Sequence, residues 1–278
     1  MRSALLWMLA GLTACSTPDA SPSGSSAAVV KTSELPAAHR AVIEAWKKGG
    51  ATWEIEREHV RSDPELSRFV VDNLLIEMVR SFDRSRLALP GQVAGPFERA
   101  QSELVLLSGQ STPVLVQSLE LKDGVVAFLA ADTLAKIGLP AVEPARRLLA
   151  ADRSESRRRA AELLERLPHA QDQEIRVQES LAERVARDPE WIVRAQSARA
   201  LGARGARNEH KGYALGVLVR ALEDDDDEVA LAAARGLGVL GEPRATERLE
   251  AALQSASQRG RVKVVAALAE SLRHLRGS

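Results

Sequence analysis

Two copies of one phrase constrain the fold of this chain most strongly. Residues 193–205 and 229–241 start 36 positions apart, and they share a valine, an alanine, an arginine, a leucine and two glycines in register. A fixed period of this size is typical of repeat architectures, in which each unit stacks only on its neighbours. The chain is therefore predicted to be a solenoid.

Weaker copies of the phrase extend the repeat in both directions, starting at Phe97, Val126, Ser156 and Val262. An amphipathic helix is predicted in front of each later copy, at Pro113–Leu121, Pro140–Ala150, Glu174–Arg187, Tyr213–Leu222 and Pro243–Gln254. Each unit is then a pair of helices whose valine, alanine and leucine stripe packs between the two. Gly202 and Gly205 are expected to end the second helix of their unit.

The region before these repeats is also predicted to be helical. Ala37–Lys48 has apolar residues on one face and is followed by two glycines, while Thr52–Val60 fits a helix or a strand, with helix favoured. Asp63 is expected to cap a helix with Pro64 at its first position. The same Asp-Pro-Glu recurs at Asp188, and both copies are expected to open the second helix of a repeat. Arg84–Gly95 is the longest irregular connection.

The phrase Val-Arg-x-x-Ala-Ala-x-Ala-Leu-Gly-x-x-Gly, with an acidic residue three positions earlier, resembles the HEAT repeat, particularly the short type of bilin-lyase-like proteins. The resemblance covers Pro96–Leu275 and, less fully, Ala37–Phe82. It implies an all-α, right-handed α-α superhelix, with the second helices on the concave face. It also implies acid–base contacts between repeats. The acidic places hold Asp123, Glu190 and Asp226, and the basic places hold Arg157, Arg194 and Lys263. Only the repeat at Val193 has both, so no continuous ladder is expected.

The N-terminus predicts export. Arg2 precedes an apolar run, Ala4–Leu12, that is too short to span a bilayer, and small residues follow it. Leu12-Thr13-Ala14-Cys15 resembles the lipobox of bacterial lipoproteins, which implies cleavage before Cys15 and lipidation of that residue. Residues 1–14 are then a signal peptide, residues 15–36 a lipidated, flexible linker and residues 37–278 the repeat domain, clearest over 96–278. The alternative is an ordinary secretory signal with an incidental cysteine.

Composition and motifs argue against several function classes. Lysine plus arginine and aspartate plus glutamate both count 38, so no net positive field favours nucleic acid. The acidic run Glu223–Glu228 lacks the spacing of a calcium loop and is expected to be a solvated turn in which Asp226 or Asp227 caps a helix. His59 and Asp63 could share a helical face, but no histidine pair has clear ligand spacing. No catalytic residue, cofactor or metal is predicted.

The candidate binding residues lie on the second helices, away from the apolar stripe. They are Lys136, Arg159, Arg166, Gln196, Arg199 and Arg235. Arginines in register on successive repeats suit carboxylates on an acidic protein segment. The alternative is that they pair with glutamates of this chain and bind nothing.

These observations predict a non-enzymatic interaction scaffold in the bacterial cell envelope. The scaffold would be held by its lipid at a membrane, the outer membrane by the lipoprotein sorting habit that Ser16 resembles. If the export signal is not real, the alternatives are a bilin-lyase-like enzyme and a DNA-binding HEAT-like protein.

Overall fold

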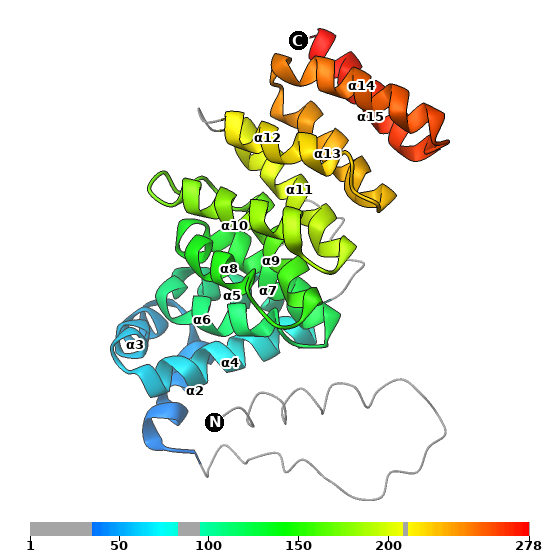
Figure 1. The fold of residues 1–278 in the computed structure, drawn as a ribbon. Coiled ribbons are helices and arrows are strands. Elements are labelled where there is room, and N and C mark those ends of the chain that lie inside the picture. The colour runs from blue at the N-terminus through cyan, green and yellow to red at the C-terminus, as the bar shows by residue number, and fades with distance from the viewer. Residues whose placement is uncertain (1–34, 83–94, 208–210, 278) are drawn as a thin grey trace, which may run out of the picture.

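The computed structural model describes residues 35–82, 95–207 and 211–277. These residues form α-helices and two short 3-10 helices and contain no strand, which confirms the all-α expectation (Figure 1). The helices are α2 (Ala37–Lys48), α3 (Gly50–Ser62), α4 (Pro64–Ser81), α5 (Pro96–Leu106), α6 (Ser108–Ser118), α7 (Gly124–Ile137), η3 (Leu139–Ala141), α8 (Val142–Leu148), α9 (Ser154–Arg166), α10 (Glu174–Arg187), α11 (Trp191–Ala206), α12 (Lys211–Ala221), α13 (Asp227–Leu240), η4 (Pro243–Ala245), α14 (Thr246–Gln258) and α15 (Val262–Gly277).

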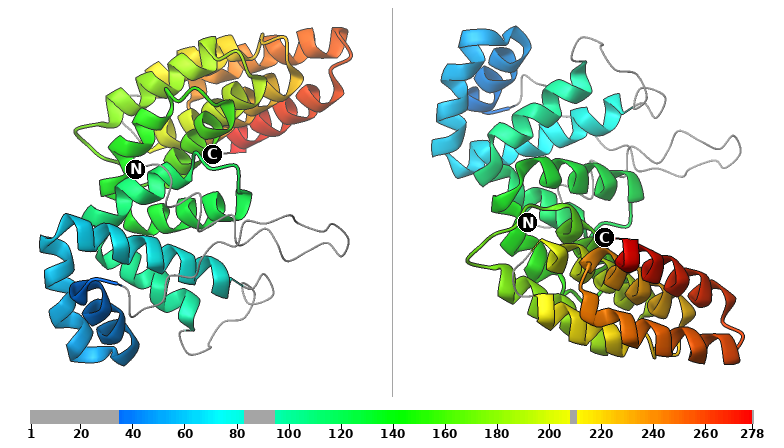
Figure 2. Two further views of the ribbon diagram at one scale, coloured as in Figure 1. Left: turned by 90° about the horizontal axis from the view of Figure 1, so that it is seen from below. Right: turned by 90° about the horizontal axis from the view of Figure 1, so that it is seen from above.

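Antiparallel helix pairs stack along an elongated, curved body, with α2 and α3 at one end and α14 and α15 at the other (Figures 1 and 2). The first helices of the pairs are α4, α6, α8, α10, α12 and α14, and the second helices are α5, α7, α9, α11, α13 and α15. From α9 onward, neighbouring second helices contact each other far more extensively than neighbouring first helices do. Because elements on the inside of a curve lie closest together, the second helices form the concave layer.

One apolar core runs the length of this stack. The alanine and leucine stripe of the repeated phrase is fully buried, as Ala198, Leu201, Ala234 and Leu237 show. Small side chains let the helices approach closely, and leucines from the neighbouring layer fill the remaining space.

Several helix bounds agree with the sequence predictions, whereas other interpretations are wrong. The predicted Ala37–Lys48 and Glu174–Arg187 are α2 and α10, and Asp63 caps α4 through hydrogen bonds from the Glu65 and Leu66 amides. However, α4 pairs with α5 and contacts α6, so it belongs to the first-helix layer. Pro113 lies inside α6 rather than at its start.

At the second Asp-Pro-Glu, Asp188 does not cap a helix with proline at its first position. The N-cap of α11 is Glu190, and its side chain makes no capping hydrogen bond. Both carboxylates accept the amide two residues later, Asp63 from Glu65 and Asp188 from Glu190, but the Asp188 carboxylate is also held by Arg157 of the preceding repeat.

The expectation that Gly202 and Gly205 end their helix is wrong, because both lie within α11. A Cβ at position 202 would lie 2.6 Å from the Cα of Gly236 and 2.7 Å from its carbonyl oxygen. Gly202 and Gly236 therefore let α11 and α13 touch through their backbones. Helix termination falls instead to Gly138 and Gly241, which have positive φ at the ends of α7 and α13.

Arginines on the second helices link successive repeats through aspartates. Arg157 of α9 donates to both carboxylate oxygens of Asp188, at 2.7 and 2.9 Å, and Arg194 of α11 donates to both oxygens of Asp224, at 2.9 Å each. Arg194 also donates to the Asp188 carbonyl, and Arg261 donates to the Asp224 carbonyl. These contacts form a continuous inter-repeat ladder from α9 to the start of α15.

The ladder corrects the sequence expectation of a broken one. Its carboxylates come from Asp188 and Asp224, two residues before the expected Glu190 and Asp226. Asp226 instead accepts the Glu228 amide as the N-cap of α13, and Asp123 caps α7. Burial raises the pKa of Asp188, but the hydrogen bonds from Arg157 and the Glu190 amide and the positive charges of Arg157 and Arg184 together outweigh burial and hold the pKa below its usual value.

Candidate functional site on the concave layer

The predicted binding residues lie on the second helices, but the structure gives them different surroundings. Lys136 is on α7, Arg159 and Arg166 are on α9, Gln196 and Arg199 are on α11, and Arg235 is on α13. Cys15 lies outside the described residues.

At the N-terminal side of this layer, the polar groups bind one another. The Asp132 carboxylate accepts a hydrogen bond from Arg166 at 2.7 Å, lies 3.4 Å from the Lys136 ammonium and also binds the Gln101 amide. Burial raises the pKa of Asp132, but the hydrogen bonds from Arg166 and Gln101 and the positive charges of Lys136 and Arg166 together outweigh burial and keep the pKa below its usual value. Lys136 also donates to Gln101. Lys136 and Arg166 are therefore both engaged by groups of this chain.

Arg159 and Gln196 are also engaged within the protein. The largely buried Arg159 donates to the carbonyls of Leu119 and Leu121 at 2.8 Å, so it holds the connection that follows α6. Gln196 donates to Glu165 of the preceding repeat at 2.8 Å. Both side chains connect neighbouring repeats rather than project freely.

Arg199 and Arg235 differ from the other four residues. Both are exposed, and neither has a hydrogen-bond or ion-pair partner within residues 35–82, 95–207 and 211–277. A Cβ at Gly236 would lie 3.1 Å from the Ala198 carbonyl oxygen, so the backbone next to Arg235 touches the backbone next to Arg199. The closest approach of α11 and α13 therefore sets two unpaired guanidinium groups on adjacent helices. The term "arginine pair" is used below for these two residues.

Two unpaired cations on touching helices are well suited to an anion. Each arginine brings a planar fork of donors that matches a carboxylate, and mutual repulsion of the two charges is relieved when an anion binds. The register of the repeats explains why the arginine pair is short. The same position holds Asp132 on α7, Glu162 on α9 and Leu268 on α15, so cations occur at only two successive steps.

A buried ion pair between α11 and α10 was not predicted from the sequence. Arg204 of α11 is fully buried, donates to Glu174 of α10 at 2.9 Å and also donates to the Leu164 carbonyl at 2.6 Å. A register signal exists, because Arg204 occupies the place that Leu167 and Leu240 hold in other repeats. The pair ties the α9–α10 connection to α11, on the side of α11 opposite to Arg199.

Neither suggested metal site is formed in the described residues. His59 lies beside Glu56, at 3.2 Å, rather than beside Asp63. Most members of the acidic run are engaged: Asp224 binds Arg194, Asp226 caps α13, Asp227 binds Arg261 and Glu228 binds Lys263. No group of three potential metal ligands occurs in residues 35–82, 95–207 and 211–277. The hydrogen bond from the Glu228 amide to the Asp226 side chain confirms Asp226 as the helix cap in the acidic run.

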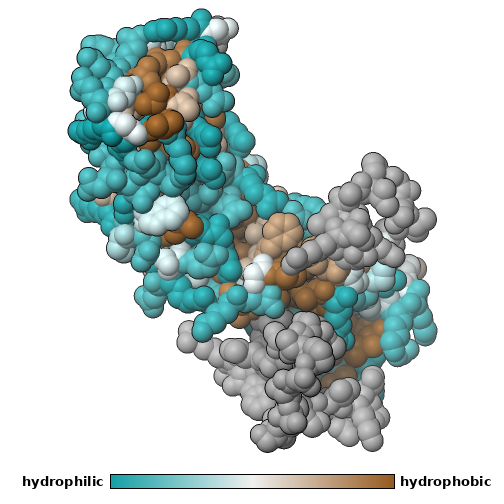
Figure 3. All heavy atoms as spheres, turned by 90° about the vertical axis from the view of Figure 1, so that its right-hand side faces the viewer, coloured by the Kyte–Doolittle hydropathy of each residue, from teal (hydrophilic) through white to brown (hydrophobic). Residues whose placement is uncertain are grey.

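The surface differs along the length of the molecule. In the space-filling view of Figure 3, apolar side chains gather at the upper end, near α14 and α15, and in the lower half, with mostly hydrophilic surface between them. No helix in the described part of the chain has the length and apolarity needed to cross a bilayer.

Comparison with solved structures returns helical-repeat proteins at low identity. The CpcE–CpcF complex of phycocyanin lyase from Nostoc sp. PCC7120 is 19% identical, covering 56% of this chain and 97% of that chain with a TM-score of 0.49. Kap121p bound to the extreme C-terminus of the protein phosphatase Cdc14p is 12% identical, covering 84% of this chain and 28% of that chain with a TM-score of 0.47.

Human deoxyhypusine hydroxylase is 17% identical, covering 90% of this chain and 93% of that chain with a TM-score of 0.38. No curated protein sequence matches significantly. Residues 179–272 match the family model for HEAT repeats, and they include the arginine pair. The chain therefore carries HEAT repeats, in an α-solenoid that begins on the N-terminal side of the matched residues.

Proposed function

We propose that this protein is a non-enzymatic HEAT-repeat scaffold that binds an acidic segment of another protein through Arg199 and Arg235. The single observation that carries the proposal is the arginine pair, two exposed cations without partners in the described residues, on adjacent helices whose backbones touch next to them. The concave layer around them presents an extended surface, and such surfaces suit elongated protein segments.

The other predicted binding residues have a supporting part in this proposal. Lys136, Arg166 and Gln196 already satisfy acidic groups of this chain, so they add little attraction for a partner. Arg159 binds the carbonyls of Leu119 and Leu121 within this chain. The acidic segment is therefore expected to be short and to centre on α11 and α13.

We further propose that a lipid on Cys15 holds the scaffold at a bacterial envelope membrane.

 The support is the sequence Leu12–Cys15, with its short apolar run and basic start, followed by a linker rich in serine. One acyl-bearing group contributes roughly 0.8 kcal/mol of membrane affinity per buried methylene, so the lipid alone can anchor a chain of this kind. The outer membrane is the proposed location.

The test is binding of a fluorescein-labelled octaglutamate peptide to the purified protein, followed by fluorescence anisotropy. The double variant Arg199→Glu/Arg235→Glu is expected to lose binding, and the wild-type affinity is expected to fall as salt rises. The matched control is Arg187→Glu/Arg220→Glu, which makes the same charge change on α10 and α12, the first helices of the same two repeats.

Equal loss of peptide binding in the two double variants would show a general charge effect and would contradict the proposal. Tighter binding of a single-stranded oligonucleotide than of the acidic peptide would favour the nucleic-acid alternative instead. Enzymatic activity is a separate question, and the non-enzymatic role stays a prediction.

A further inference from the structure

A pocket of about 670 Å³ lies between α2, α4 and α5, at the opposite end of the solenoid from the arginine pair. Its walls are mainly apolar and aromatic, formed by Val42, Ile43, Trp46, Phe69, Val70 and Leu74. A volume in the range of roughly 300–1,000 Å³ with mostly apolar walls and few polar groups is typical of small-molecule sites. The proposed function does not use this pocket.

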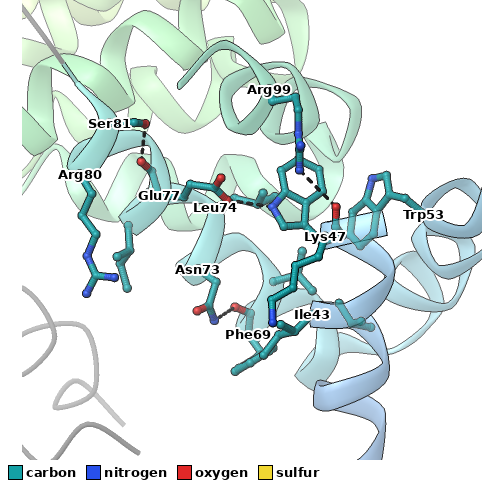
Figure 4. A pocket seen from close by; sticks show the side chains of 14 residues that line it. Ile43, Lys47, Trp53, Phe69, Asn73, Leu74, Glu77, Arg80, Ser81 and Arg99 are labelled. Carbon is teal, nitrogen blue, oxygen red and sulfur yellow. Dashed lines mark hydrogen bonds between the residues drawn. The ribbon is translucent and has the colours of Figure 1, made fainter. Parts of the chain in front are cut away.

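The aromatic wall is held in place by specific contacts. The Trp46 ring packs edge to face against Trp53, with 5.1 Å between centroids, and its Nε1 donates to Glu77 at 2.8 Å. The Arg99 guanidinium lies 4.3 Å from the centre of the Trp46 ring and donates to the Trp46 carbonyl. These contacts, visible in Figure 4, fix the indole as a rigid wall.

The polar groups of the lining give the pocket a net positive charge. Lys47, Arg80 and Arg99 are cationic, and Glu77 is the one carboxylate among the lining residues. Glu77 is engaged by the Trp46 indole, whereas Arg80 is exposed and has no partner in the described residues. Figure 4 shows Lys47 reaching from α2 toward Asn73 and Phe69 of α4. Lys47 also makes a solvent-exposed ion pair with Glu44, which a ligand can replace at little cost.

We propose that this pocket binds a fatty acid, with the acyl chain between α2 and α4 and the carboxylate at Lys47, while Arg80 adds positive charge at the rim. The apolar walls match the chain, and the cationic rim matches the anionic head. A neutral amphiphile of the same length satisfies only the first of these two requirements, which makes the contribution of the rim measurable.

The experiment uses tryptophan fluorescence of the full-length protein in a Trp7→Phe/Trp191→Phe background, so that emission reports Trp46 and Trp53. Laurate is titrated below its micelle concentration, with dodecanol as the neutral analogue. A saturable change in emission is expected, with laurate bound about tenfold more tightly than dodecanol, because only laurate carries the negative charge that the cationic rim can bind.

Variants locate the site. Lys47→Ala is expected to weaken laurate binding several-fold, and Arg80→Ala to weaken it less, with dodecanol binding unchanged in both, while Arg273→Ala on α15 leaves both ligands unchanged. Asn73→Phe, which adds a ring beside Lys47, is expected to weaken both ligands at least tenfold, with the fold checked by circular dichroism.

Equal affinity for laurate and dodecanol, or rim variants that bind laurate as the parent does, would overturn the proposal, and this result does not depend on whether Asn73→Phe folds. An emission change with phosphatidylcholine vesicles but not with laurate would indicate membrane contact rather than a fatty-acid site. Loss of octaglutamate binding in the arginine-pair variant bears on the other site only, so the two proposals fail independently.

Discussion

Replacement of Gly202 by alanine should destabilise the protein, although alanine is the better helix former. The added Cβ would lie 2.6, 2.7 and 2.9 Å from the Cα, carbonyl oxygen and carbonyl carbon of Gly236. All three atoms are backbone, so no side-chain rotation relieves the overlap. The two helices must separate by at least several tenths of an ångström, which loosens the buried packing around Ala198 and Leu237.

The magnitude follows from two opposing effects. Overpacking a well-packed core costs typically about 1–3 kcal/mol. The better helix propensity of alanine returns up to about 1 kcal/mol. The backbone position of the clash favours the upper part of the first range, so a net loss of about 1–2 kcal/mol is expected.

The assay is urea unfolding followed by circular dichroism at 222 nm, with Gly216→Ala as the matched control. Gly216 lies inside α12, and its added Cβ would meet only the Arg220 guanidinium, at 3.9 Å. The free energy of unfolding of the control is expected to be unchanged or to rise by up to about 1 kcal/mol. If Gly202→Ala is as stable as Gly216→Ala, then α11 and α13 do not touch through their backbones and the argument for the arginine pair loses its geometric basis.

Three further predictions concern packing, pH and the membrane. Leu201→Ala should lower the free energy of unfolding in urea by roughly 2–5 kcal/mol, because Leu201 is fully buried. Arg199→Ala should leave the free energy of unfolding nearly unchanged, and equal losses in the two variants would contradict the register of α11. The folded-state pKa of Asp188 is lowered, so the stability that its carboxylate contributes is present above the unfolded pKa of about 3.9 and is lost as pH falls through the folded pKa. Asp188→Asn should therefore be less stable than the parent at pH 7 and should lose less stability between pH 7 and pH 2. Parallel profiles of stability against pH for the two proteins would refute this role. Cys15→Ser should leave the protein unprocessed or release it from the membrane fraction, and full processing with full membrane recovery would refute lipidation.

The repeated phrase was sufficient to predict the helix pairs, because apolar periodicity depends on local spacing alone. The bounds of α2 and α10 agree with the prediction for this reason. The role of Gly202 was missed because a glycine that ends a helix and a glycine at a helix contact look the same in one sequence. Only the position of Gly236 on the neighbouring helix separates the two cases.

The inter-repeat contacts needed three-dimensional information. Arg157 and Arg194 were identified as basic positions, but their partners lie two residues earlier than expected, because Asp226 is used as the cap of α13. Of the six candidate binding residues, sequence register placed all of them on second helices. It could not show that Arg159 binds backbone carbonyls while Arg199 does not, since side-chain partners depend on how the repeats stack.

The most direct test of the account is to locate a bound acidic peptide on the surface. A carbodiimide reagent joins lysine amines to carboxylates without a spacer, so octaglutamate is cross-linked to the Arg199→Lys/Arg235→Lys variant and the products are mapped by mass spectrometry. The account predicts cross-links at positions 199 and 235, and none at the substituted positions of Arg187→Lys/Arg220→Lys. Cross-links confined to native lysines such as Lys47 and Lys122, in both variants, would contradict it.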